Sequence, residues 1–189
     1  MPNIIAHYIC GKQIAKKLNI KDNEYLRGNI YPDYVDKNKH YRINGRMFDI
    51  PDIDAFMQQE QIENQLFKLG FLTHLMLDKL FLDVYVVDII YSKIDKNINI
   101  FVPGKIYTDY TNISKRLLAH YHLDINEIDM LMQEKTTDYD VLKYKSNISV
   151  IKKCKTEELQ YLNINSFINF LDCSSEKIAN YILRSKYLK

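Results

Sequence analysis

The sequence FKLGFLTHLMLDKLF, from Phe67 to Phe81, places apolar residues on nearly every side of a helix. A helix at a protein surface carries a single apolar stripe, so this pattern predicts a helix that is buried on all sides. His74 and Asp78 interrupt the apolar run, and because they are four residues apart they lie on one face of the helix, one turn apart. We take this segment as the central helix of the fold.

A carboxylate in an apolar helix is costly unless its charge is compensated. A metal ion shared by Asp78 and His74 would compensate the charge. A buried hydrogen bond between the two side chains, serving the fold alone, would do the same. The residues of this segment leave both interpretations open.

The rest of the chain is also typical of a helical protein. It contains only 5 Gly and 4 Pro, which are the residues that most often end helices. Apolar periodicity therefore favours an all-α, multi-helix bundle that forms a single domain over residues 1–189. The predicted helices cover residues 4–18, 22–27, a segment starting at 50–54, 110–121, 126–133, 164–171 and 175–183, the last with Ser174 or Ser175 as its N-cap.

Composition excludes several classes of protein. Lys and Arg number 26 against 24 Asp and Glu, a net charge of +2 that gives no indication of a nucleic-acid partner. The three cysteines, Cys10, Cys154 and Cys173, are too few and too far apart for a disulfide framework or a cysteine-based zinc finger. The chain has no signal-peptide pattern and no apolar run of membrane-spanning length. We expect a cytoplasmic protein with no membrane span.

The first 80 residues hold a set of side chains with metal-ligand chemistry: His7, Asp33, His40, His74 and Asp78. Taken singly, His7 near a helix start and Asp33 in a turn are more often capping or turn residues. Together, three imidazoles and two carboxylates suit zinc, or iron, manganese or nickel. Five protein ligands exceed what one tetrahedral zinc takes and fit two ions bridged by a carboxylate, an arrangement that activates water and stabilises a phosphoryl transition state.

Four pieces of sequence, in order along roughly residues 1–85, resemble the bacterial zinc-dependent phospholipase C family. That family shares its all-α fold with the single-strand-specific zinc nucleases. The pieces are Met1-Pro2 followed by Ala6-His7 and Gly11; GNIYPD from Gly28 to Asp33; His40-Tyr41-Arg42; and LGFLTHLMLD from Leu69 to Asp78.

The resemblance implies a role for each matching residue. His7 would bind one zinc ion. Asp33, His40, His74 and Asp78 would surround a second ion, with Asp78 as the bridge. Asp33 also matches the position of the family's proposed general base.

The chain departs from the family in two respects. Arg42 has no matching role, although its guanidinium could contact a phosphate near the metals. The secreted phospholipases hold a third zinc ion downstream of the central helix with two histidines and a glutamate. Here the next histidines are His120 and His122, and Asp124 has the position of a helix cap, so we expect no third site.

The predicted function is a hydrolase: a metal-dependent phosphoesterase that attacks a phosphodiester or phosphomonoester with a metal-activated water. Its substrate would be a phosphate-ester small molecule or a lipid headgroup. One alternative is an HD-type phosphohydrolase, against which the lack of an adjacent His-Asp pair counts. The other is a non-catalytic helical protein that binds a metal or a partner. Residues 1–92 form the metal-site half, and residues 93–189 complete the helical fold without an assigned role.

Overall fold

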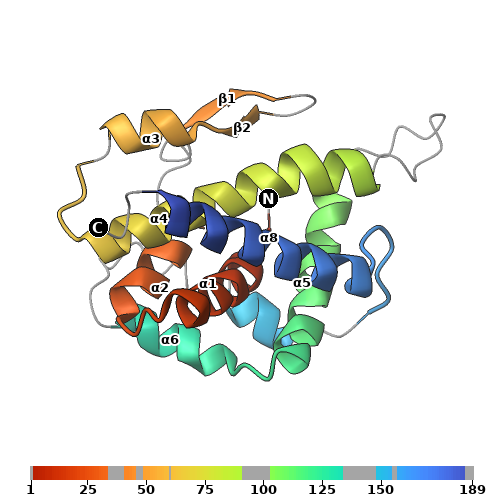
Figure 1. Cartoon of the computed structure of the whole chain (residues 1–189). Helices are drawn as coiled ribbons and strands as arrows, with labels where there is room; N and C mark the ends of the chain where they lie inside the picture. The colour runs from red at the N-terminus through yellow and green to blue at the C-terminus, as the bar shows by residue number, and fades with distance from the viewer. Residues whose placement is uncertain are drawn as a thin grey trace.

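The computed structural model describes residues 2–33, 41–45, 49–59, 61–90, 103–133, 148–154 and 157–185. The chain is predominantly helical, which confirms the predicted all-α class, with one small hairpin among the described residues (Figure 1). The elements are α1 (Ile4–Leu18), α2 (Asn23–Ile30), η1 (Tyr31–Asp33), β1 (Arg42–Asn44), β2 (Asp49–Pro51), α3 (Ile53–Gln59), α4 (Gln65–Leu80), η3 (Phe81–Ile90), α5 (Pro103–His120), α6 (Ile125–Gln133) and α8 (Ile164–Arg184). Residues 148–153 are also helical.

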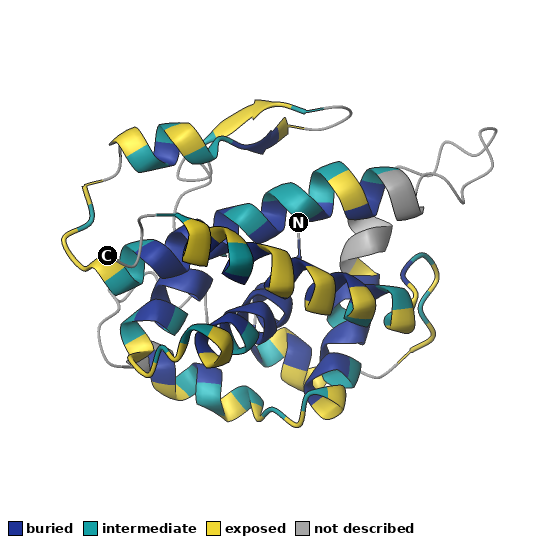
Figure 2. Ribbon diagram, viewed as in Figure 1, coloured by how far each residue is buried: buried dark blue, intermediate teal, exposed yellow. Residues whose placement is uncertain are grey.

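Helix α4 is the predicted central helix. The side chain of Asn64 caps its start by accepting hydrogen bonds from the backbone N–H groups of Leu66 and Phe67, both at 3.0 Å. Every residue from Leu69 to Leu75 is buried, and the helix packs against α1, α2, α3 and α8. Figure 2 shows the buried residues gathered where α1, α2 and α4 meet. At its C-terminal end α4 continues directly into the π-helical segment η3.

Two glycines let α2 and α4 pack with their backbones in contact. A Cβ atom added at Gly28 would overlap the carbonyl oxygen of Phe67, and one added at Gly70 would overlap the carbonyl oxygen of Tyr25. Helix α2 continues through Gly28 to Ile30, three residues beyond its predicted end at Arg27. Glycine is unfavourable inside a helix, but here the close approach of α4 requires it.

Helix α8 corrects one sequence prediction. It is a single helix of 21 residues, where the sequence predicts two helices separated by a cap at Ser174 or Ser175. Both serines are buried within the helix, and Ser175 Oγ donates a hydrogen bond of 2.5 Å to Gln13 Oε1 of α1. This contact satisfies the Ser175 hydroxyl inside the helix, so no cap forms there. The N-cap is Asn163, whose side chain accepts from the N–H of Ser166.

One hydrophobic core contains residues from both sides of residue 92. In its C-terminal part, aromatic rings from η3, α5 and α8 pack in mostly edge-on and tilted pairs, with centroids 4.9–6.5 Å apart for the pairs that join different elements. Aromatic pairs of this kind add to the stability gained by burial. The rings involved in these pairs are Phe81, Tyr85, Tyr110, Phe167 and Phe170.

No described helix combines the length and the apolar character needed to cross a bilayer.

Candidate metal centre

Three of the predicted ligands meet in the interior of the protein. His7 comes from the first turn of α1, and His74 and Asp78 lie one turn apart on α4. His7 Nε2 is 3.3 Å from Asp78 Oδ1, and His74 Nε2 is 3.5 Å from Asp78 Oδ2. All three side chains are 0% exposed. The structure thus brings together side chains from two helices that the sequence analysis assigned to a metal site.

The start of α1 fixes the position of His7. Asn3 caps the helix by accepting a hydrogen bond of 3.2 Å from the N–H of Ala6, and its amide nitrogen donates to the Tyr110 carbonyl oxygen at 2.8 Å and to Ser114 Oγ at 2.5 Å. One asparagine therefore both starts α1 and ties that start to α5. This holds His7 in a fixed place opposite α4.

The orientation of His74 is set by the end of α2. His74 Nδ1 lies 2.8 Å from the carbonyl oxygen of Asn29. Because a carbonyl oxygen can only accept, Nδ1 carries the proton of this bond and Nε2 faces Asp78. The ring of His7 stacks on that of His74, with centroids 3.6 Å apart and planes inclined by 12°.

The charges of the three groups are strongly coupled. Burial is the largest influence on the pKa of His7 and, with the nearby His74, lowers it. Burial also acts to lower the pKa of His74, but the charge and hydrogen bond of Asp78 outweigh it and raise that pKa. For Asp78, burial acts to raise the pKa, but both histidines outweigh it and hold the pKa far below its usual range. The two histidines therefore favour the charged form of Asp78, and Asp78 favours the charged form of His74, against the effect of burial.

The donor set fits a divalent transition-metal ion. One ligand atom from each of the three residues can be chosen so that all lie within 4.8 Å of one another. Tetrahedral ligands of zinc, at bond lengths of about 2.0–2.2 Å, lie about 3.4 Å apart, close to the observed contacts of 3.3 and 3.5 Å. Two imidazoles and a carboxylate are also the ligand types that zinc takes.

Several buried polar atoms around the three residues have no hydrogen-bond partner among the described residues. They are His7 Nδ1, both amide atoms of Asn29 and Asp33 Oδ2. Buried polar groups are nearly always hydrogen-bonded, and an ion or water that belongs to the site is a common reason for exceptions. These atoms therefore support a site that is completed by a bound ion and its ligands.

Asp33 lies beside this group but is not part of its closest set. It ends the short 3₁₀ turn η1, directly after Pro32. Its negative charge acts to raise the pKa values of both His7 and His74, so it lies within electrostatic range of the two rings. Asp33 is not among the described residues whose ligand atoms lie within 4.8 Å of one another, which are His7, His74 and Asp78.

The other two predicted site residues are placed differently. His40 lies outside the described residues. Arg42 is exposed on β1, and its Nη1 donates a hydrogen bond of 2.9 Å to the Asp49 carbonyl oxygen across the hairpin. Its role as a phosphate contact stays a prediction.

Two further acidic residues have structural roles. Asp124 accepts a hydrogen bond of 2.9 Å from the N–H of Asn126, which confirms it as a cap of α6. Asp109 is buried and accepts hydrogen bonds from the backbone N–H groups of Gln160, Tyr161 and Leu162. Its carboxylate therefore holds the segment before α8 against α5.

Asn29 is the residue of this site that sequence reasoning missed. It follows Gly28 and precedes Tyr31-Pro32, so it reads as a turn residue. A helix that continues through Gly28 would have placed it one turn after Tyr25, on the same buried side. That periodicity is the signal that could have found it.

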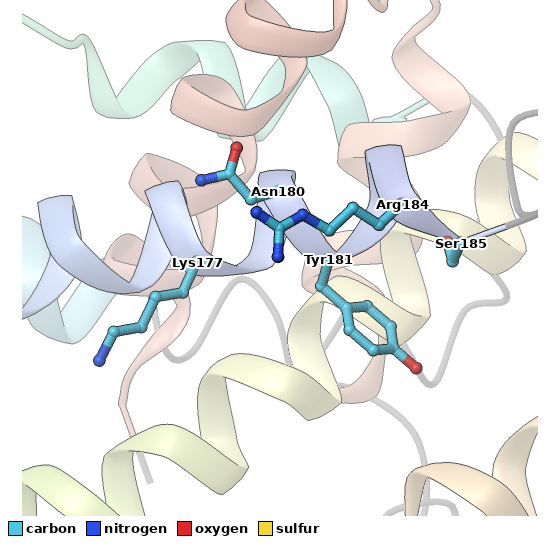
Figure 3. A pocket seen from close by; sticks show the side chains of 5 residues that line it. All are labelled: Lys177, Asn180, Tyr181, Arg184 and Ser185. Carbon is cyan, nitrogen blue, oxygen red and sulfur yellow. The ribbon is translucent and has the colours of Figure 1, made fainter.

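Surface hollows lie elsewhere. One of about 430 Å³ is lined by Lys177, Asn180, Tyr181, Arg184 and Ser185 at the C-terminal end of α8 (Figure 3). Another of similar volume lies between α8, α4 and the hairpin region. Neither is lined by His7, His74 or Asp78, so the two hollows are separate from the metal-ligand cluster.

Comparison of the chain with protein-family models, with curated proteins and with solved structures finds no match, so the functional assignment rests on these residues and their geometry.

Proposed function

We propose that this protein is a metal-dependent phosphoesterase whose metal centre is built on His7, His74 and Asp78. The observation that carries the proposal is the meeting of two imidazoles and one carboxylate at 0% exposure, with contacts of 3.3 and 3.5 Å. Burying an ionised carboxylate is unfavourable unless it is paired or coordinates a metal. Two histidines and one carboxylate supply three protein ligands, the number that a catalytic zinc ion takes.

The substrate class follows from the wider set of residues. A bound divalent cation lowers the pKa of water and stabilises negative charge on phosphoryl oxygens. Asp33 lies at the border of the cluster, where its carboxylate would orient the attacking water and accept its proton. The resemblance of the four N-terminal pieces to the zinc-dependent phospholipase C family supports a phosphodiester or phosphomonoester as substrate. Asp33 and His40 would add ligands for a second ion, with zinc as the expected metal.

The second candidate is a structural metal centre without catalysis. Complete burial of His7, His74 and Asp78 favours it, because catalytic metals keep a position open for substrate. In that case the metal would tie α1 to α4, and the protein would act by binding a partner.

Metal analysis combined with a hydrolysis screen separates these candidates. Protein purified without added metal is analysed for metal content, then loaded in turn with zinc, manganese or iron and tested on phosphodiester, phosphomonoester, nucleotide and lipid-ester substrates. A bound metal with hydrolysis supports the phosphoesterase. A tightly bound metal with no hydrolysis of any class supports the structural centre, and no metal binding at all rejects both.

A further inference from the structure

We propose that Asn29 positions both histidines of the metal centre: its backbone carbonyl orients His74, and its side-chain amide orients His7. The proposal rests on the metal centre described above and extends it to a residue outside the ligand set. Asn29 acts through the histidines, so it is a positioning residue and not a ligand.

The contact with His74 is already formed. Asn29 lies in the last turn of α2, where backbone carbonyl groups have no partner within the helix. Its carbonyl oxygen is therefore available to accept the Nδ1–H of His74, at 2.8 Å. This bond selects the tautomer of neutral His74 that presents Nε2 to a metal.

The side-chain amide of Asn29 could orient the second histidine, because its polar atoms are not used in other hydrogen bonds among the described residues. It is 0% exposed, and neither Oδ1 nor Nδ2 has a hydrogen-bond partner among the described residues. The Nδ1 atom of His7 is also buried and has no hydrogen-bond partner among the described residues. Burying an amide without hydrogen-bond partners is unfavourable, so a role that uses it is expected.

Gly11 places the amide next to His7. His7 and Gly11 are four residues apart on α1 and so share one face of that helix. A Cβ atom at Gly11 would lie 2.7 Å from Asn29 Oδ1, which means that the amide occupies the space left by the missing side chain. Asn29 thus presents an acceptor to the face of α1 that carries His7, one turn away.

Metal-ligating histidines almost always donate their second N–H to a carbonyl, a carboxylate or a water. For His7, a buried acceptor on this face is Asn29 Oδ1; since the two atoms share no direct hydrogen bond, one buried water would join them. One residue would then hold both stacked rings with their Nε2 atoms directed at Asp78.

The test uses the full chain in metal-free form and measures three quantities. These are the affinity for zinc and for cobalt by chelator competition, the visible absorption spectrum of the cobalt complex, and the melting temperature of the metal-free protein. Asn29→Leu keeps the branched shape of the side chain and removes both polar atoms, whereas Asn29→Asp keeps an acceptor oxygen. Asn23→Leu makes the same change at the exposed first residue of α2 and serves as the matched control.

Asn29→Leu should weaken zinc and cobalt binding by about 10–100-fold, the usual effect of losing a residue that orients a ligand. It should also change the cobalt spectrum. The melting temperature of its metal-free form should stay the same or rise, because an unpaired buried amide has been removed. Asn29→Asp should bind at least as tightly as the parent, and Asn23→Leu should match the parent in all three measurements.

A second variant keeps the test decisive if Asn29→Leu does not fold. Gly11→Ala introduces a Cβ that displaces the amide while helix propensity favours the alanine, so it should weaken metal binding in a folded protein. Parent affinity and an unchanged cobalt spectrum in a folded Asn29→Leu or Gly11→Ala variant would overturn the role of the Asn29 side chain and leave the metal centre standing. A parent protein that binds neither zinc nor cobalt would overturn both.

Discussion

His7 and His74 lie on different helices with their imidazole rings stacked, 3.6 Å between centroids, and each directs Nε2 at a different oxygen of Asp78. Two stacked imidazoles that both face one buried carboxylate bring polar groups together inside an apolar core. Such an arrangement is costly for the fold alone and becomes favourable when a cation is shared between the groups. The relationship between these two rings is therefore the main structural argument for a metal centre.

The proposed base can be tested by amide substitution. Asp33→Asn should lower the turnover of a phosphodiester or phosphomonoester by roughly 10²–10⁴-fold, because the amide cannot accept a proton from the attacking water. Metal content should remain at one ion or more, since His7, His74 and Asp78 are unchanged. Steady-state kinetics and metal analysis on the same preparation check this. Parent-level turnover in the variant would mean that another group serves as the base.

Close packing of α2 and α4 should be sensitive to one methyl group. Gly70→Ala should destabilise the protein by about 1–3 kcal/mol, because the added Cβ overlaps the Tyr25 carbonyl oxygen and must push the helices apart. The same displacement moves the Asn29 carbonyl away from His74, so metal affinity should fall as well. Urea unfolding and chelator competition measure the two effects. Unchanged stability would show that the helices can separate at no cost.

Metal affinity should depend on pH through His74. The metal must displace the proton from Nε2, and the charge of Asp78 holds that proton to a higher pH than in an ordinary histidine. His7 has a lowered pKa and is already neutral at neutral pH, so it adds no second proton. Apparent affinity should fall about tenfold per pH unit below the raised pKa of His74, as expected for one displaced proton.

Calorimetric titrations with zinc across a pH series in two buffers give both the affinity and the number of protons released. The variant His120→Ala, at an exposed histidine that ends α5, should follow the parent curve. A pH-independent affinity through this range would contradict the assignment of His74 as a ligand.

Much of the helical framework could be predicted from the sequence because its signals are local. Helix α1 has the predicted bounds, and α4 combines an apolar run with a cap at Asn64. Two errors arose where a tertiary contact overrides a local preference. Ser175 resembles a cap but bonds to Gln13 inside α8, and Gly28 resembles a helix end but is the point where α4 approaches α2.

The site could be predicted only in part, for a similar reason. The spacing of His74 and Asp78 places them on one face of a helix and is visible in the sequence. His7 was a candidate only by residue type and through the resemblance to a family, because no local pattern joins α1 to α4. Asn29 was missed because its contribution is a backbone carbonyl and a buried amide, and residue type reveals neither.

The measurement that tests the metal centre most directly is a zinc titration of the metal-free parent and of Asp78→Asn, followed by calorimetry and by melting curves with and without zinc. The parent should bind at least one equivalent and melt at a higher temperature when loaded, because the ion stabilises the folded state by joining α1 to α4. Asp78→Asn should bind no zinc at this site and show no such rise, because the amide lacks the charge that both histidines face. Equal zinc binding and equal stabilisation in parent and variant would contradict the account.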